Sequence, residues 1–187
     1  SMCRKCKGFY VWSTYYGGDQ EDKARHCATD PLGNVYMAGH TFSDHPPNQG
    51  VISSGGNVHQ ATYGGFTDGD DYYTGDGFLV KFNSAGTREW GTYYGGSNDD
   101  EAYGCATDLD GNVYISGATQ PLSGPAIAPP GGHQTQFGLG AGGALDGYLA
   151  KFNTNGQRQW GTYYGGNGSE LGYDCTTDNF GNVYLAG

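Results

Sequence analysis

Residues 90–114 read WGTYYGGSNDDEAYGCATDLDGNVY. This stretch of 25 residues recurs without a gap at residues 12–36 and 160–184, and 13 of its positions are identical in all three copies. The shared residues are the tryptophan, the run Thr-Tyr-Tyr-Gly-Gly, a cysteine, the pair Thr-Asp and a closing Gly-Asn-Val-Tyr. Repetition of this kind is the sequence signature of a repeat architecture, so the chain is a series of similar structural units.

A second repeated block lies between these copies. Residues 76–82 read DGFLVKF and residues 146–152 read DGYLAKF, and each block precedes the next tryptophan. Apolar side chains alternate within the blocks, as in Phe78, Val80 and Phe82, which is the period of a β-strand. We therefore expect four strands in each repeat.

Glycine turns connect the expected strands. A Gly-Asn pair separates two strand runs in every copy, and glycine supplies the positive φ that a tight hairpin needs. Gly86 and Gly156 have the same place before their tryptophans. An aspartate precedes each Gly-Asn pair, and we expect its side chain to bond the turn backbone. These aspartates are Asp30, Asp108 and Asp178.

The composition agrees with an all-β protein. Of 187 residues, 36 are glycine and 16 are tyrosine, which favours many short strands joined by turns over helices. Four short antiparallel strands per repeat are typical of a propeller blade and not of a sandwich. The predicted fold class is therefore an all-β propeller whose blades have four antiparallel strands.

The repeats divide the chain into parts of one propeller fragment over residues 1–187. We expect residues 9–18 to be the outer strand of a preceding blade, residues 19–96 and 97–166 to be blades, and residues 167–187 to be the first half of a further blade. That is roughly 2.75 blades, whereas a closed ring typically needs about 4 to 8. The incomplete ring is a fragment of a longer protein, which we favour, an oligomer that completes the ring, or an open array.

The charge of the chain excludes some partners. The formal net charge of −10 argues against nucleic acid and against an anionic membrane surface, since both attract basic proteins. No segment reaches the roughly 18 consecutive apolar residues of a membrane span. We expect no nucleic-acid partner and no membrane insertion.

The repeated blocks resemble the bacterial beta-propeller repeat called SBBP. The resemblance rests on W-x-T-Y-Y-G-G, D-x-x-G-N-V-Y and D-G-F-L-V-K-F and covers nearly the whole chain. It implies a propeller within large secreted or surface-attached bacterial proteins, and it implies no established catalytic residues. This chain departs from the family in placing a cysteine where an aliphatic residue is usual, at Cys27, Cys105 and Cys175.

An acidic loop is the candidate metal site. Asp68, Asp70 and Asp71, with Asp76 nearby, could present carboxylate oxygens to Ca²⁺, which is the one cofactor we consider. The next blade replaces this loop with a glycine-rich stretch, so the site would belong to one blade, and a solvated acidic loop is the favoured alternative. Cys3 and Cys6 have the spacing of half a zinc site, but no second pair follows.

Two further sets of residues invite a functional interpretation. Carboxylates follow the Tyr-Tyr-Gly-Gly runs at residues 19–22 and 98–101, where they would attract cations or basic partners, or simply form hydrated connecting loops, which we favour. The three repeated cysteines are expected to be buried small side chains, too far apart at the spacing of blades for a disulfide.

No catalytic motif is present, neither G-x-S-x-G nor H-E-x-x-H nor a phosphate-binding loop. We therefore expect a non-enzymatic extracellular or cell-surface module, a scaffold or adhesion surface that uses loops 40–76 and 118–146 to bind a protein or glycan. Its other partners would be the remaining blades of a longer chain, or further copies. The alternatives are a propeller domain of a secreted hydrolase or lyase and, from the Gly-x-x-x-Trp spacing at residues 86–90 and 156–160, a quinone-type oxidoreductase.

Overall fold

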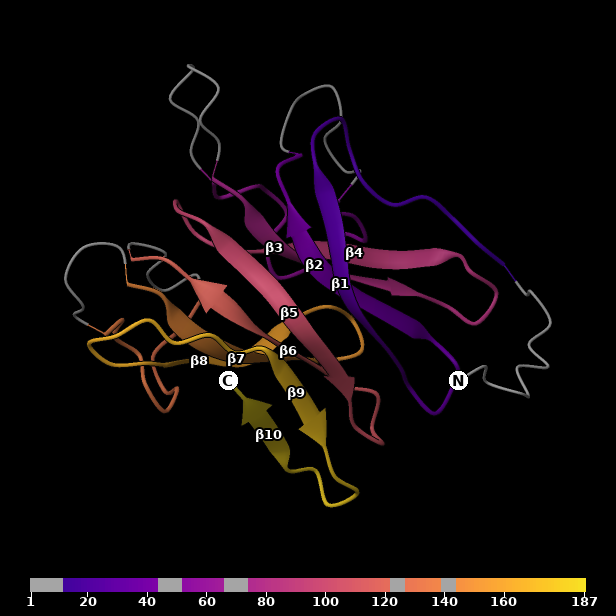
Figure 1. The fold of residues 1–187 in the computed structure, drawn as a ribbon. Helices are drawn as coiled ribbons and strands as arrows, with labels where there is room; N and C mark the ends of the chain where they lie inside the picture. Colours follow the sequence, from indigo (N-terminus) through magenta and orange to yellow (C-terminus); the bar gives the residue numbers. More distant parts are fainter. Residues whose placement is uncertain (1–11, 44–51, 66–73, 122–126, 139–143) are drawn as a thin grey trace, which may run out of the picture.

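The computed structural model describes residues 12–43, 52–65, 74–121, 127–138 and 144–187. These residues form ten β-strands and no helix, which confirms the predicted all-β class (Figure 1). In this described part of the chain, accordingly, no helix has the length and apolar character to cross a membrane.

The strands form three antiparallel sheets. The first sheet consists of β1 (Asp22–Thr29), β2 (Val35–Thr41), β3 (Asp76–Phe82) and β4 (Arg88–Tyr94), paired in chain order. The second consists of β5 (Asp100–Thr107), β6 (Val113–Thr119), β7 (Asp146–Phe152) and β8 (Arg158–Tyr164), also in chain order. The third consists of β9 (Asp174–Thr177) and β10 (Val183–Ala186). The sheets do not close into a ring, in agreement with the predicted incomplete propeller.

The two four-stranded sheets share their register in detail. Val35 pairs with Phe82 across β2 and β3, and Val113 pairs with Phe152 across β6 and β7. The ladders β1–β2 and β5–β6 each contain a register shift at the same repeat position, and so do β3–β4 and β7–β8. The predicted repeat is thus a repeat of backbone geometry as well as of sequence.

The predicted turns are confirmed. Gly33 and Gly111 both have a φ of 78°, and the glycine that closes each β1–β2 and β5–β6 turn donates its N–H to the carbonyl of the preceding aspartate. This φ lies in the left-handed region, where a side chain is strained, so glycine is the residue that fits.

Successive sheets pack face to face, as Figure 1 shows for the order β1, β5 and β9. β5 lies against β1 and β2, and β9 lies against β5 and β6. The largest apolar cluster joins the first two sheets, with Tyr36, Trp90 and Tyr94 on one side and Tyr148 and Phe152 on the other. The first strands of successive sheets, β1, β5 and β9, are therefore neighbours, and we call them the inner strands.

The central strands are buried on both faces because a sheet or segment covers each face. In β3, Phe78, Val80 and Phe82 point into one cluster and Leu79 points into the other. This is the alternation predicted from the sequence, with a period of two residues.

The expected outer strand at residues 9–18 is not seen as a strand. Residues 9–11 lie outside the described residues, and residues 12–18 have no strand assignment. β4 is fixed by its ladder with β3, whereas within the described residues no strand pairs with residues 12–18. Side chains hold the segment in place instead: Trp12 packs on Phe82, and the hydroxyl of Tyr16 donates to the carbonyl of Ile52 at 2.7 Å.

Candidate functional site

The hairpin between the first two strands of each sheet is built around its aspartate. The carboxylate of Asp108 accepts the backbone N–H groups of Asp110 and Asn112, the side-chain amide of Asn112 and the hydroxyl of Tyr114. Asp30 and Asp178 make the same set of bonds. The predicted bond from the aspartate to the turn backbone is thus confirmed in all three copies. Hydrogen bonds to Asn182 lower the pKa of Asp178 to about 2.

Each of these hairpins exposes one large apolar side chain at its tip. Leu32 is 81% exposed, Leu109 is 64% exposed and Phe180 is 90% exposed. The hydroxyl of Thr107 donates to the carbonyl of Thr29 at 2.8 Å, and that of Thr177 donates to the carbonyl of Thr107 at 2.7 Å, so the three hairpins are linked side by side. We call the tips Leu32, Leu109 and Phe180 the hairpin rim. Sequence reasoning did not single out these three side chains.

A row of polar and aromatic side chains crosses the inner strands. Arg25 of β1 lies 3.4 Å from a carboxylate oxygen of Glu101 in β5, and its guanidinium stands over the ring of Tyr103 at 5.9 Å. Tyr103 in turn packs on Tyr173, with ring centroids 6.1 Å apart. Burial, together with the charge of Glu101, raises the pKa of Tyr103 to about 12.

His40 adds a buried polar group to the first junction between sheets. Its Nδ1 lies 3.4 Å from the same carboxylate of Glu101, without the geometry of a hydrogen bond. Burial lowers the pKa of His40, and the attraction of Glu101 only partly offsets this effect. The second blade has Ala118 at this position, so the contact belongs to one junction alone.

The tryptophan and second tyrosine of the outer strand reach across to the next sheet. The indole N–H of Trp90 donates to the carbonyl of Thr154 at 2.9 Å, and the ring covers Gly156, where a Cβ would lie 2.9 Å from it. The hydroxyl of Tyr94 donates to the carbonyl of Ile127 at 2.6 Å. Gly86 and Gly156, at the spacing that suggested quinone chemistry, thus accept the tryptophan of the preceding copy, Trp12 on Gly86 and Trp90 on Gly156.

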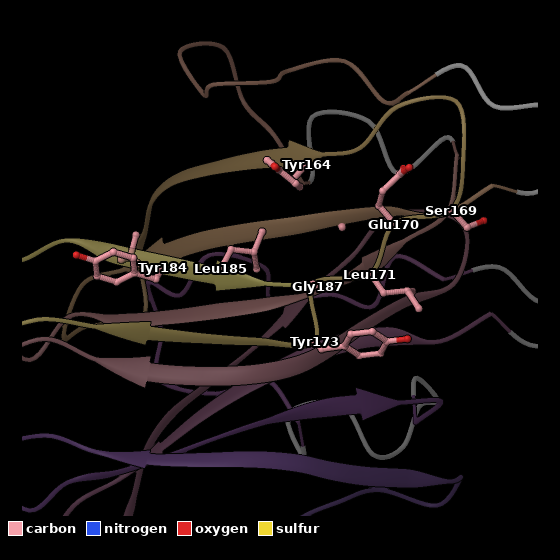
Figure 2. Close-up of a pocket in the computed structure, with 11 residues that line it drawn as sticks. Tyr164, Ser169, Glu170, Leu171, Tyr173, Tyr184, Leu185 and Gly187 are labelled. Atoms are coloured by element: carbon pink, nitrogen blue, oxygen red, sulfur yellow. The ribbon is translucent and has the colours of Figure 1, made fainter.

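A pocket of about 640 Å³ lies after β8, at the junction between the second sheet and the β9–β10 sheet (Figure 2). Tyr164 lies on one side, and the segment before β9 and strand β10 lie on the other. At the preceding junction, Tyr94 holds the position of Tyr164 and is covered by the rings of Tyr148 and Phe152, at 5.1 and 5.5 Å. The pocket therefore has the shape and chemistry of a blade junction.

Of the four candidate calcium ligands, the structure describes only Asp76. Asp68, Asp70 and Asp71 lie outside the described residues, as do parts of loops 40–76 and 118–146. Asp76 is fully buried at the start of β3, where its Oδ2 accepts the N–H of Gly64 and the side-chain amide of Gln60. The loop site for calcium stays a prediction.

The expectation of hydrated carboxylates after the Tyr-Tyr-Gly-Gly runs is wrong for Asp100. This residue is fully buried, and its carboxylate accepts the N–H of Gly96 at 2.6 Å. Asp99 accepts the N–H of Gly75 at 2.7 Å. Packing of the next inner strand against the preceding sheet removes Asp100 from water, which a sequence pattern of polar residues does not reveal.

The three repeated cysteines differ in their exposure. Cys27, Cys105 and Cys175 are free thiols, as predicted, and Cys105 and Cys175 are buried. Cys27 is exposed, contrary to the prediction, because it lies in a groove beside Trp12 and Tyr16 that no inner strand covers in the described structure. Burial raises the pKa of Cys175 to about 12, which keeps its thiol unreactive.

The described part of the chain contains no group of side chains suited to a metal ion. Cys3 and Cys6 lie outside it. Inside it, no three His, Cys, Asp or Glu side chains gather in a way that could hold a metal ion.

Parts of the repeat match a known family of repeats. Residues 11–45 and 89–120 match the family model SBBP, a beta-propeller repeat. Two segments of the chain are therefore similar to this repeat. The first match includes Trp12, β1 and β2, and the second includes Trp90 of β4, β5 and β6. Residues 160–184 share the same 13 identical positions. No curated protein matches the chain.

Proposed function

We propose that this chain is a non-enzymatic propeller module of an extracellular or cell-surface protein, acting as a scaffold and as a binding surface for a protein or glycan. The location rests on the SBBP repeats, whose resemblance implies secreted or surface-attached bacterial proteins. The scaffold role rests on the use of the repeated side chains: the tryptophan, tyrosine, aspartate and threonine positions make the contacts between sheets or within turns.

The pocket after β8 supports the scaffold role. β2 and β6 are each paired on both edges, whereas β10 is paired with β9 alone among the described residues. A further pair of strands of the β7–β8 type fits this edge and would cover Tyr164 as Tyr148 and Phe152 cover Tyr94. The partner that fits is thus the rest of a blade, from a longer chain or from another copy.

The single observation that carries the binding role is the hairpin rim. Leu32, Leu109 and Phe180 are exposed on neighbouring turns that share the aspartate, the Gly-Asn pair and the hydrogen bonds but differ in the two residues between them. Apolar side chains grouped at a surface are typical of interaction sites, and aromatic groups stack on sugar rings or peptide side chains. Because these side chains are exposed and are not part of the apolar core, contact with a binding partner would explain why they are apolar.

The test compares the chain with a rim variant on a panel of immobilised polysaccharides and proteins. We expect the triple substitution Leu32→Ser, Leu109→Ser and Phe180→Ser to abolish binding while the melting temperature stays near that of the parent. Tyr15→Ser is the matched control, since Tyr15 is fully exposed but belongs to none of the three hairpins. Equal binding by the rim variant would contradict the proposal.

The same samples test the enzymatic alternatives. Release of reducing ends or of new carbohydrate double bonds from the polysaccharides would favour the hydrolase or lyase. Reduction of a dye in the presence of a quinone cofactor would favour the oxidoreductase. No turnover, with binding that depends on the rim, is the expected result.

A further inference from the structure

Another pocket, of about 440 Å³, lies between the first sheet and the β7–β8 hairpin of the second sheet. Two of its residues, Lys81 of β3 and Trp90 of β4, are buried, whereas Asn57, Glu89 and Asn155 are exposed around them. The pocket is therefore open to solvent. Its volume is within the range of roughly 300 to 1,000 Å³ that is typical of sites for small ligands.

The two charged side chains of the pocket neutralise each other. The ammonium of Lys81 lies 2.9 Å from Oε2 of Glu89, and it donates to the carbonyl of Thr154 at 3.4 Å. A cation in the pocket would draw Glu89 away from a buried ammonium, which is costly, and an anion would face the carboxylate of Glu89. The pocket is thus suited to a ligand without net charge.

Uncharged hydrogen-bonding groups supply much of the remaining lining, from Asn57, Asn155 and Gln157. The side-chain amides of Asn57 and Asn155 make no hydrogen bond to another described residue, so both can bind a ligand. An amide group donates and accepts hydrogen bonds, and so does each hydroxyl group of a sugar. This chemistry fits a polyhydroxylated molecule, whereas an apolar ligand would find little more than the indole of Trp90.

Most of these polar residues are absent from the other copy of the hairpin. Residues 83–90 read NSAGTREW and residues 153–160 read NTNGQRQW, so the first asparagine, the glycine, the arginine and the tryptophan are shared. Three pocket residues are not shared: Asn155 corresponds to Ala85, Gln157 to Thr87 and Glu89 to Gln159. The shared residues form the turn and the packing between sheets, so the others are available for a role at this junction alone.

We propose that this pocket binds a neutral sugar, as a free saccharide or as part of a glycan. The amides of Asn57, Asn155 and Gln157 bind its hydroxyl groups, and the indole of Trp90 borders its apolar C–H groups. The site goes beyond the proposed function, because it shares no residue with the hairpin rim and does not depend on binding there.

Isothermal titration calorimetry of the whole chain tests the proposal with cellobiose, xylobiose, mannobiose, maltose and diacetylchitobiose, each up to about 10 mM. We expect saturable binding of at least one of them. The double variant Asn57→Ala, Asn155→Ala should lose about tenfold or more in affinity, because both amides are removed. Alanine already occupies the position of Asn155 in the other copy, so the melting temperature should stay near that of the parent.

Two control variants separate this pocket from other surfaces. Asn167→Ala removes an exposed asparagine outside the pocket and should bind like the parent. The triple rim variant, Leu32→Ser, Leu109→Ser and Phe180→Ser, should also retain sugar binding, whether or not the rim binds a partner of its own.

Four outcomes would overturn the proposal. One is that none of the disaccharides binds, and another is that the double asparagine variant binds like the parent. Loss of sugar binding in the rim variant, with binding retained in the double variant, would assign the sugar to the hairpin rim. Binding of trialanine in place of the sugars, lost in the double variant, would make the ligand a peptide.

Discussion

Residues 90–96 and 160–166 have the same sequence, WGTYYGG, and the same strand geometry, but not the same surroundings. Tyr94 in the first segment is 0% exposed, and Tyr164 in the second is 62% exposed. Tyr94 donates to Ile127 and packs on Tyr148, whereas Tyr164 borders the pocket of Figure 2.

The difference teaches that burial in this repeat is a property of the junction and not of the strand. The outer strand carries the aromatic side chains, and the following sheet supplies the carbonyl, the glycine turn and the rings that receive them. His59 shows the same dependence, since it packs on Tyr94 and Phe152 while its counterpart His133 is exposed. The stability of each blade should therefore depend on its neighbour.

The largest expected effect comes from the tryptophan. Trp90→Ala should lower the free energy of unfolding by about 3 to 5 kcal/mol, because the indole is buried and its removal leaves a cavity at the junction. Trp160→Ala should cost about 1 kcal/mol, because Trp160 is only partly buried. Urea denaturation of both variants measures the difference, and equal losses would show that the strand alone determines the burial.

A smaller effect is expected from a single hydroxyl. Tyr94→Phe should cost about 1 kcal/mol, because the carbonyl of Ile127 loses the hydroxyl of Tyr94 and keeps only the guanidinium of Arg158, at 3.3 Å, as a donor. Tyr164→Phe should stay within about 0.5 kcal/mol of the parent. The same denaturation curves give both values, and a costly Tyr164→Phe would mean that the pocket is already filled in solution.

The smallest effect concerns the pH dependence of the first junction. The pKa of His40 is lower in the folded chain than in the unfolded chain, so the unfolded chain binds more protons as the pH falls below about 6.5, the ordinary pKa of histidine. The contribution of His40 is thus fully present above that pH and is lost as the pH falls toward the folded pKa. Glu21, Lys23, Arg25 and Glu101 all act on this group.

His40→Gln should therefore weaken the pH dependence of stability, compared between pH 7.5 and pH 5 by urea midpoints. His133→Gln, at an exposed position, is the matched control. A pH dependence that is unchanged in His40→Gln but reduced in His133→Gln would show that the junction does not govern this titration.

The sequence was sufficient for the elements that local chemistry determines. The period of two residues predicted β3 and β7, the Gly-Asn pairs predicted the hairpins, and Asp30, Asp108 and Asp178 bond the turns as expected. Each of these features depends on neighbours within a few residues in the chain, so repetition made them visible.

Contacts between blades were harder to foresee. The buried state of Asp100, the exposure of Cys27 and the lack of strand pairing at residues 12–18 all depend on which segment lies against each residue, and that segment is distant in sequence. The burial of Asp76 was invisible for the same reason, since a buried aspartate and a solvated one have the same letter.

The threonine hydroxyls that link the hairpins all point the same way, from Thr177 to Thr107 and from Thr107 to Thr29, while the tryptophans point in the opposite direction along the array. Every sheet therefore has a front and a back that differ. A front and a back cannot meet through a two-fold axis, because such an axis joins identical surfaces. An assembly in which the front of one copy contacts the back of the next is therefore heterologous, and it forms a ring or an open filament and not a symmetric dimer.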